Sequence, residues 1–445
     1  MHGFKKGTVK MSNKVKVFKF GGASIKDVAA IKNVGSILKR YPADKLLIVV
    51  SAMGKTTNAL EKVLEAYAAQ NGKEFEYFEA IKAEHQELLE ALFPKDHEIF
   101  AALNDTFIEI EWVIEEPPQD DYDYLYDQIV SIGEMVSSKI IAAYLNLEGL
   151  STQWLDARDV IQTDNTYRDG KVNWEETNKR AMEVVPPLFS KSNFVLTQGF
   201  IGGTSENFTT TLGREGSDYS AAIFSYSLDA ESMSIWKDVP GILTGDPRLF
   251  DDVTKIDRLS YKEAIEMTYY GAKVIHPKTI KPIQNKNIPL YVKSFEDPEA
   301  AGTIISEEAD ISYPPVVVVE SVQVLLHIST RDFSFVAEHH LSHLFQLFAK
   351  HRIKINMMQN MAISFSVCVT DNPRRLADLL KELHENYNVR KDENLELITI
   401  RHYKEEVINS LLQGKVILFE ERIRETVQMV VRDVPVMKRR VEPGV

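Results

Sequence analysis

A lysine followed by two glycines closes the first apolar run of the chain, in the sequence Lys19-Phe20-Gly21-Gly22. Glycines let backbone N–H groups approach a ligand closely, a helix N-terminus favours negative charge, and lysine adds a full positive charge. These residues could therefore form a phosphate site. An ordinary strand-to-helix turn has the same composition, so this segment alone leaves both interpretations open.

A second polar segment, Gly213-Arg214-Glu215-Gly216-Ser217-Asp218, carries both signs of charge. Arg214 could bind a carboxylate through two hydrogen bonds, and Asp218 could bind an ammonium group or a metal. The alternative, which is compatible with binding, is that Ser217 or Asp218 caps the helix that follows. The three threonines just before this segment, 209–211, are predicted to lie in a loop.

Three further segments hold candidate contact residues. Ser131-Ile132-Gly133-Glu134 lies inside an apolar helical run, where a ligand approaching the helix would account for the Gly-Glu pair and a solvent-facing Glu134 is the alternative. Asp246-Pro247-Arg248 offers a turn with a cation, although alone it is only a turn. Lys273 is either a nucleotide contact or a solvated lysine at a helix end.

The elements that must position these residues alternate between short β-rich runs and longer helical ones. This rhythm is typical of a three-layer α/β domain with a mainly parallel central sheet. Predicted strands cover residues 15–20, 46–50, 194–199 and 232–236, helices dominate 58–147, and an alanine-rich helix covers 219–228. Lys19 is thus expected at the end of the first strand, and the charged segment at the start of a helix.

The domain boundaries follow from composition. Residues 1–14 are expected to form a loose tail and residues 15–305 the α/β domain, while the acidic segment 306–315 ends in Pro-Pro and is predicted to be a linker. In residues 316–445 strands and helices repeat on a smaller scale, which predicts two small α+β modules in tandem, the second of them abbreviated.

Composition restricts the class of protein. The 445 residues carry 52 Lys+Arg against 65 Asp+Glu, a net charge of -13 that weakens any nucleic-acid or anionic-membrane interpretation. The one cysteine, Cys368, cannot form an intrachain disulfide, so a cytoplasmic location is expected. No apolar run approaches the roughly 20 residues of a membrane span. His339 and His343 are expected on a solvated helix face, and no metal-ligand set is predicted.

Taken in order, six segments resemble the motifs of the aspartate kinases, members of the amino-acid kinase superfamily. The resemblance runs from about Lys16 to Pro277, and its specificity comes from the whole series. The six segments are Lys19-Phe20-Gly21-Gly22-Ala23-Ser24, Ser51-Ala52 with Thr57-Asn58, Gly133-Glu134, Gly213 to Asp218, Asp238 to Arg248, and Gly271 to Pro277. The modules after residue 316 look like the ACT domains that bind amino-acid inhibitors in that family.

The resemblance implies that the γ-phosphoryl group of ATP is transferred to the side-chain carboxylate of L-aspartate, the first step of lysine, threonine and methionine biosynthesis. Mg²⁺ would bridge the phosphate oxygens. A carboxylate with a pKa near 4 is already ionised at neutral pH, so the reaction needs charge neutralisation and alignment more than acid-base help. Another carboxylate kinase, acting on glutamate or N-acetylglutamate, and a non-catalytic amino-acid sensor are the rival hypotheses.

The resemblance also implies a role for each candidate residue. Lys19 and Asp218 would be catalytic, with Lys19 and the Gly21 and Gly22 amides stabilising the transferring phosphoryl group. Arg214 would bind the substrate α-carboxylate and Glu134 its ammonium group. The remaining assignments are Thr57 and Ser217 in the amino-acid pocket, and Asp238, Arg248 and Lys273 on the nucleotide side.

Four residues depart from the family pattern, namely Ala23, Glu215, Lys237 and Leu243. Glu215 places a negative charge beside Arg214 where a glycine is usual, and its side chain is expected to point outward. Lysine or threonine is the expected inhibitor at the ACT-like modules. A homodimer is expected because the edges of ACT sheets can pair with a second chain.

Overall fold

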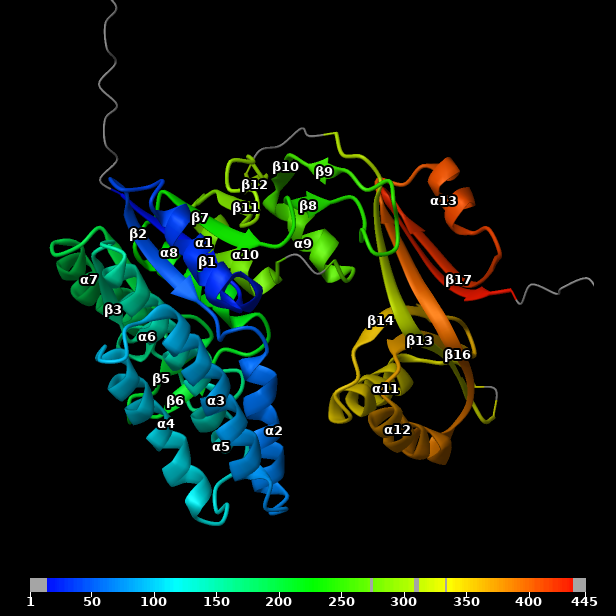
Figure 1. The fold of residues 1–445 in the computed structure, drawn as a ribbon. Coiled ribbons are helices and arrows are strands. Elements are labelled where there is room, and N and C mark those ends of the chain that lie inside the picture. The colour runs from blue at the N-terminus through cyan, green and yellow to red at the C-terminus, as the bar shows by residue number, and fades with distance from the viewer. Residues whose placement is uncertain (1–13, 273–274, 308–311, 333, 435–445) are drawn as a thin grey trace, which may run out of the picture. The chain divides into compact units, whose positions relative to one another are not determined.

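The computed structural model describes residues 14–272, 275–307, 312–332 and 334–434 (Figure 1). Among these residues the chain divides into two compact units. The first contains residues 14–242, 255–265 and 275–307, and the second contains residues 243–254, 266–272 and the described residues from 312 onward. The second unit therefore includes two short segments that come from earlier in the chain.

The first unit is built on an eight-stranded sheet with the strand order β10-β12-β11-β7-β1-β2-β4-β3. Every neighbouring pair is parallel except β11 and β12, which confirms the predicted mainly parallel sheet. In chain order the strands are β1 (Val15–Phe20), β2 (Lys45–Val50), β3 (Thr152–Leu155), β4 (Phe194–Gln198), β7 (Ser232–Lys237), β10 (Arg258–Ser260), β11 (Leu290–Ser294) and β12 (Thr303–Ser306).

The sheet is buried on both faces, and this fixes the direction of Lys19. Phe18 and Phe20 belong to a large apolar core formed with the helices on one face. Because side chains alternate along a strand, Val17 and Lys19 point to the opposite face. Val17 is also fully buried. Near its carboxyl end, this strand thus carries one buried lysine, Lys19, among apolar side chains.

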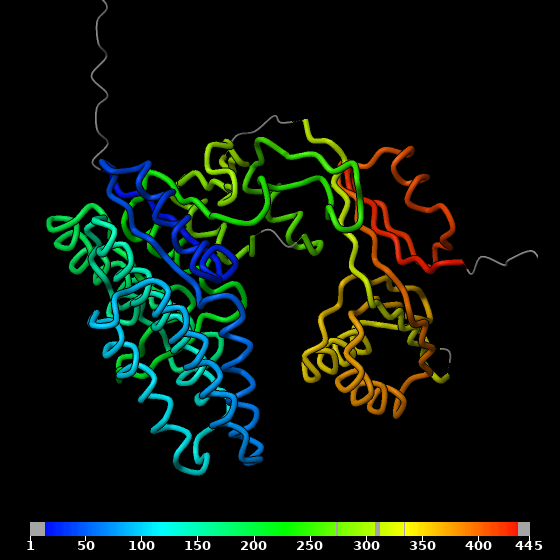
Figure 2. The backbone as a smooth tube through the Cα atoms, viewed as in Figure 1, coloured from blue at the N-terminus to red at the C-terminus, as the bar shows by residue number. Residues whose placement is uncertain are grey.

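Helices cover both faces of this sheet (Figures 1 and 2). Helices α1 to α6 share the core of Phe18 and Phe20, whereas α7, α8 and α10 pack on the other side. Their bounds are α1 (Val28–Leu38), α2 (Thr56–Ala68), α3 (Glu74–Leu92), α4 (Ile99–Glu115), α5 (Tyr122–Val130), α6 (Ile132–Leu147), α7 (Trp174–Phe189), α8 (Gly216–Ser227) and α10 (Pro277–Asn285), with α9 (Tyr261–Tyr269) having residues in both units. Asp27 caps α1 by accepting a 2.8 Å hydrogen bond from the Ala30 N–H.

Short elements complete the first unit. They are the 3₁₀ helices η1 (Gly22–Ile25) and η2 (Ala157–Asp159), the strand pair β5 (Ile201–Gly203) and β6 (Thr209–Thr211), and the strands β8 (Ile242–Leu243), which ends in the second unit, and β9 (Lys255–Ile256). The loop predicted for the three threonines is therefore wrong. They form β6 because their backbone groups pair with β5. The three side chains are also buried.

The second unit contains a six-stranded antiparallel sheet with the order β14-β15-β13-β16-β18-β17. Its strands are β13 (Val316–Thr330), β14 (Ile355–Asn360), β15 (Ser364–Thr370), β16 (Tyr387–Arg401), β17 (Lys415–Ile423) and β18 (Thr426–Asp433). Its helices are α11 (Glu338–Lys350), α12 (Pro373–Asn386) and α13 (Glu405–Leu411). On α11, His343 is half-buried beside the Tyr387 hydroxyl, so the predicted solvated face is correct for His339 alone.

The two α+β modules of this unit are interleaved in the chain rather than consecutive. The second half of β13, α11, β14, β15, α12 and the first half of β16 form one βαββαβ module. The other module combines the first half of β13, where Val316 pairs with Arg401, with the second half of β16, α13, β17 and β18. The second module looks abbreviated in the sequence because the entire βαββαβ module separates its first strand, the first half of β13, from its other elements. No described helix is long and apolar enough to cross a membrane.

Candidate active site

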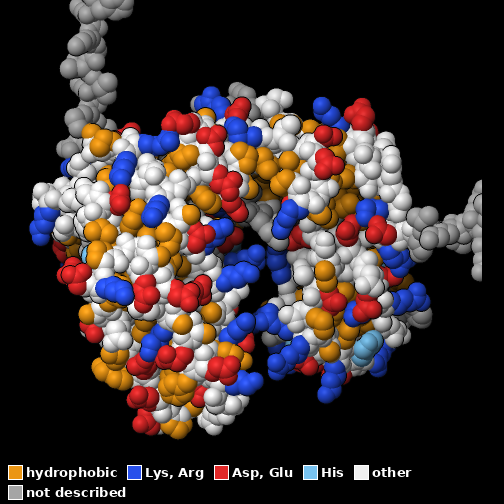
Figure 3. Space-filling view, in the orientation of Figure 1, with side chains coloured by type: hydrophobic (Ala, Val, Ile, Leu, Met, Phe, Trp, Pro, Cys, Tyr) orange, Lys and Arg blue, Asp and Glu red, His pale blue; other side chains and the backbone are white. Residues whose placement is uncertain are grey.

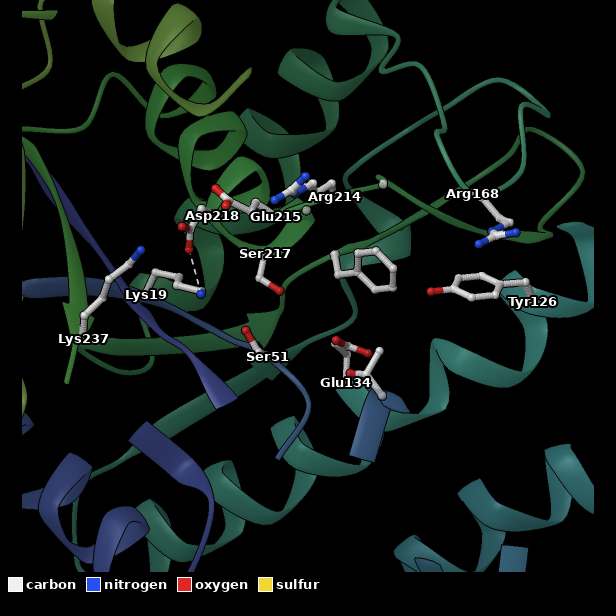
Figure 4. A pocket seen from close by; sticks show the side chains of 14 residues that line it. Lys19, Ser51, Tyr126, Glu134, Arg168, Arg214, Glu215, Ser217, Asp218 and Lys237 are labelled. Atoms are coloured by element: carbon white, nitrogen blue, oxygen red, sulfur yellow. Dashed lines mark ion pairs between the residues drawn. The ribbon is translucent and has the colours of Figure 1, made fainter. Parts of the chain in front are cut away.

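A cavity of about 490 Å³ opens in the first unit, around the carboxyl ends of β1, β2 and β7. In parallel α/β sheets the loops at this edge converge, so side chains that are distant in sequence can face one space. The residues that line the cavity are Lys19, Ser51, Thr57, Tyr126, Glu134, Arg168, Phe200, Gly213, Arg214, Glu215, Gly216, Ser217, Asp218 and Lys237 (Figure 4). Six of the eleven residues predicted for the site are among them: Lys19, Thr57, Glu134, Arg214, Ser217 and Asp218.

Lys19 and Asp218 form a buried ion pair across the cavity. Lys19 Nζ lies 2.7 Å from Asp218 Oδ1, so the two side chains attract each other by charge. Burial raises the pKa of Asp218, but the positive charges of Lys19 and Lys237 outweigh burial and hold that pKa below its usual range. Asp218 is therefore ionised at neutral pH, and two ammonium groups stand where an anion can be bound.

Glu134 lies in the middle of the cavity and is almost completely buried. Burial raises the pKa of Glu134 to about 8, although the Ala52 N–H, 3.2 Å from Oε1, and the charge of Lys19 counteract part of this effect. Its second oxygen, Oε2, has no hydrogen-bond partner among the described residues. A buried carboxyl group with a free oxygen is suited to receive a cationic group from a ligand.

The helix that carries Glu134 starts later than the sequence predicted. Helix α5 ends at Val130 and α6 begins at Ile132, so Glu134 lies in the first turn of α6 rather than mid-helix. The expectation that Gly133 makes room for a ligand is wrong. A Cβ atom at Gly133 would lie 3.0 Å from Ala52 Cβ and 3.2 Å from Leu60 Cδ1, so this glycine allows α6 to pack against the β2–α2 segment.

The segment before α8 also corrects two expectations. The N-cap position of α8 is Glu215, in a left-handed conformation (φ 53°), and neither Ser217 nor Asp218 has that place. The Glu215 side chain does not point outward, since it lines the cavity and its Oε2 atom is buried without a hydrogen-bond partner among the described residues. Arg214, by contrast, is exposed at the cavity, so its guanidinium donors face solvent and any bound ligand.

Four other predicted residues, Gly21, Gly22, Asp238 and Arg248, lie outside the cavity lining. Gly22 serves a close approach between loops, because a Cβ there would lie 2.8 Å from the Ala52 carbonyl oxygen, and neither it nor Gly21 lines the cavity. Asp238 is exposed one residue beyond Lys237, which does line it. Arg248 belongs to the second unit and pairs with Asp246 at 2.5 Å. Lys273 lies outside the described residues.

Five residues of the cavity lining were given no role in the site from the sequence, namely Ser51, Tyr126, Arg168, Phe200 and Lys237. Ser51 and Lys237 carried a usable signal, because each directly follows or ends an apolar strand, as Lys19 does. Tyr126 and Arg168 carried none, since one lies on an ordinary helix and the other in a polar loop far from any motif. Only the folding of the chain brings them to the cavity.

Comparison with known proteins places the fold and the cavity in a defined class. Residues 14–294 match the model of the amino acid kinase family. The lysine-sensitive aspartokinase 3 of Escherichia coli is 31% identical over 407 residues, which cover 87% of each chain.

Two crystal structures of E. coli aspartokinase III are 28% identical to the chain. The complex with aspartate and ADP has a TM-score of 0.80 and the alignment covers 94% of this chain and 96% of that one. The complex with lysine and aspartate has a TM-score of 0.79 over 94% and 95%. The chain therefore belongs to the amino acid kinase family and, within it, to the aspartokinases.

Proposed function

We propose that the protein transfers the γ-phosphoryl group of ATP to the side-chain carboxylate of L-aspartate, giving 4-phospho-L-aspartate. The observation that carries the proposal is that Lys19, Glu134, Arg214 and Asp218 line one cavity although they are up to 199 residues apart. The crystallised E. coli relative, with aspartate and ADP bound, supports the same pair of substrates.

The chemistry that such a cavity must supply is mainly electrostatic. A phosphoryl donor and a carboxylate acceptor are both anionic and repel each other, so positioned cations lower the barrier. We assign this work to Lys19, with Lys237 beside it, at the end of the cavity where Asp218 lies. Asp218 holds the Lys19 side chain by the ion pair, and it therefore sets the position of the ammonium group relative to the transferring phosphoryl.

The amino-acid end of the cavity would recognise the rest of the substrate. Glu134, with its free oxygen, would accept the ammonium group of aspartate, and Arg214 would donate to the α-carboxylate. Thr57 and Ser217, each in the first turn of a helix, would add hydroxyl contacts and the favourable field of a helix N-terminus. Each charged group of the substrate would then bind a protein group of the opposite charge.

The residues assigned to ATP binding are supported by fewer contacts in the structure than those assigned to the amino acid. The Gly21 and Gly22 amides, Asp238, Arg248 and Lys273 remain proposed contacts of ATP. Mg²⁺ is usually held by one or two carboxylates together with phosphate oxygens. Glu215, whose buried Oε2 has no hydrogen-bond partner among the described residues, and the neighbouring Asp218 fit such an ion. When bound, Mg²⁺ would neutralise charge on the phosphates.

One assay tests the proposal against its rivals. ADP release is measured from MgATP with L-aspartate, L-glutamate or N-acetylglutamate, for the protein and for Lys19→Ala. We expect turnover with L-aspartate and at least a hundredfold loss in the variant. Faster turnover with a glutamate derivative would identify another carboxylate kinase. Tight binding of an amino acid without any turnover would identify a sensor.

The second unit would bind an inhibitory amino acid. Its βαββαβ module has the ACT-like fold, and the E. coli relative has been crystallised with lysine. We propose lysine as the inhibitor, with threonine as the alternative. Initial rates at increasing lysine or threonine, each with a fixed concentration of L-aspartate near its KM, decide between them. Rates that neither amino acid changes would refute regulation by this unit.

The same unit supports a homodimer. Strand β14 is an edge of the six-stranded sheet, and four apolar side chains in and around the β14–β15 hairpin are exposed: Phe335, Met358, Met361 and Ile363. Unpaired edges and exposed apolar patches are usually covered by another chain. Light scattering should give twice the mass of one chain, and Met358→Glu should shift the protein towards the monomer. A monomeric parent protein would refute this assembly.

We also propose a cytoplasmic location, because the buried thiol of Cys368 is the only cysteine in the sequence and is expected to stay reduced. Fractionation of cells that express the full chain, with an antibody against it, tests this. Recovery in a secreted or organellar fraction would contradict the proposal.

A further inference from the structure

Arg168 lines the cavity from the side opposite Lys19. Figure 4 shows Lys19 and Lys237 at one end of the cavity, Glu134 and Ser217 between, and Arg168 with Tyr126 at the other end. The guanidinium carbon of Arg168 lies 4.3 Å from the centre of the Tyr126 ring, and Nη1 donates a 3.1 Å hydrogen bond to Asp123 Oδ1. Each guanidinium has five N–H donors, so most of them remain available to a ligand.

The backbone of Arg168 is anchored by a buried carboxylate. Its N–H donates a 3.0 Å hydrogen bond to Asp127 Oδ2, and Asp127 is fully buried. The same carboxylate accepts hydrogen bonds from the Thr211 N–H at 2.9 Å and from Thr211 Oγ1 at 2.6 Å. Asp127 thus ties the loop of Arg168 to α5 and to β6. The left-handed conformation of Arg168 (φ 66°), which is uncommon for arginine, is held by this network.

The charges that line the cavity differ in their surroundings. Lys19 is paired with Asp218, and Arg214 lies beside Glu215 in the same loop (Figure 4). Glu134 occupies the middle. Aspartate has its two carboxylates on either side of its ammonium group. When the reacting carboxylate is near Lys19 and the ammonium near Glu134, the other carboxylate must point away from Lys19, towards the end where Arg168 lies.

We propose that Arg168 is a specificity-determining residue that, together with Arg214, binds the substrate carboxylate that does not react. The proposal rests on the proposed aspartate kinase function. Tyr126 supports the flat guanidinium from below and Asp123 fixes its rotation, so the side chain is oriented before a substrate arrives. Such orientation reduces the entropy lost on binding and favours a planar carboxylate over a neutral amide.

The test compares two acceptors with two variants. L-Aspartate and its α-carboxamide, L-isoasparagine, share the reacting carboxylate and differ only in the group that Arg168 is proposed to bind. In Arg168→Ala, kcat/KM for L-aspartate should fall about 10- to 100-fold, mostly through KM, the range for loss of a charged hydrogen bond. The value for L-isoasparagine should change less than about threefold, so the preference for aspartate shrinks. Arg168→Lys should keep part of the preference.

Controls separate this role from a structural one. Arg180→Ala, an exposed arginine on α7 that pairs with Glu176, should behave as the parent protein. An equal loss with both acceptors in Arg168→Ala, or no loss with either, would overturn the proposal, and Arg168→Lys gives the answer if the alanine variant fails to fold. Absence of turnover in the parent protein with either acceptor would instead count against the aspartate kinase function itself.

Discussion

The two sheets of this protein use charge in different ways. In the mainly parallel sheet of the first unit, both faces are covered, and the two strand lysines that line the cavity, Lys19 and Lys237, lie at or near the carboxyl ends of their strands. In the antiparallel sheet of the second unit, most ion pairs are at the surface, such as Arg422 with Glu405. Acidic and basic side chains are interspersed over the visible face of each unit (Figure 3).

This difference has an energetic consequence. A charge in a buried site interacts strongly with its neighbours and shifts their pKa values, whereas an exposed pair is screened by water and salt. Burial of the charged groups at the cavity therefore carries a desolvation free energy in the first unit. The exposed ion pairs of the second unit carry little of this cost. Substitutions of charged residues should accordingly have large effects on activity at the cavity of the first unit and small effects on stability at the exposed ion pairs of the second.

The largest expected effect is that of Lys19→Ala. Removing the buried ammonium takes away the ion-pair partner of Asp218 and a cation at the phosphoryl end, so kcat should fall by about 10²–10³. Steady-state kinetics with L-aspartate and MgATP measure the loss. The matched control is Lys39→Ala, an exposed lysine that pairs with Glu148, and it should keep the parent rate. Equal rates in both variants would show that the buried and the exposed lysine do not differ in their importance for activity.

A smaller and pH-dependent effect is expected at Glu134, whose pKa burial raises to about 8. Only the ionised form attracts an ammonium group, so KM for L-aspartate should decrease as pH rises from 6 to 8 and then level off. Glu134→Gln should raise KM about 10- to 100-fold and abolish this pH dependence. Calorimetry in buffers of different ionisation enthalpy should also show that aspartate binding releases a proton from the parent protein.

Glu134 also affects stability, in the opposite direction. Its pKa in the folded state lies above the ordinary glutamate value of 4.5, so the folded state binds the proton more tightly than the unfolded state. The contribution to stability is therefore complete below about pH 4.5 and is lost as pH rises through about 8. Unfolding by denaturant at pH 6 and pH 8 should show a difference that Glu134→Gln lacks. A difference that survives this substitution would have another source.

A structural effect is expected in the second unit at Val322. This exposed valine has a φ of 60° at a register shift of β13, where the strand passes from one module to the other. A β-branched residue in this conformation stores roughly 1–3 kcal/mol of strain. Val322→Gly should therefore raise the melting temperature by a few degrees, without changing kcat. A lower melting temperature would show that packing, not strain, governs the junction.

The smallest effect is expected for Arg422→Ala, which breaks an exposed pair with Glu405. Surface ion pairs contribute about 0.2–1 kcal/mol, and salt weakens them further. The melting temperature should change by no more than a few degrees at low salt and less at high salt. A large and salt-insensitive loss would mean that the second unit also depends on strongly coupled charges.

Much of the fold was predictable because apolar patterns are local. The strand predicted at 15–20 is β1, and most of the helix predicted at 219–228 belongs to α8. The prediction was wrong where tertiary contacts override the pattern. The apolar run around Glu134 reads as one helix, but the chain breaks it at Ser131, and the threonines of β6 form a strand only because β5 lies beside them.

The sequence pattern also did not predict that the two modules are interleaved. Periodicity shows that strands alternate with helices, but it does not tell which strands pair. The long strands β13 and β16 each serve both modules, and only the register of their pairing reveals this.

By itself, the sequence determined the class of fold and the order of its motifs, because burial periodicity and turn chemistry act over short distances along the chain. It also placed Lys19 at the end of the first strand. Only the tertiary structure decided that Glu215 turns into the cavity, that Gly133 serves packing, and that Arg168 and Tyr126 close the far end. These outcomes depend on which surfaces meet in space, and the free energy of such contacts is not encoded in any single segment.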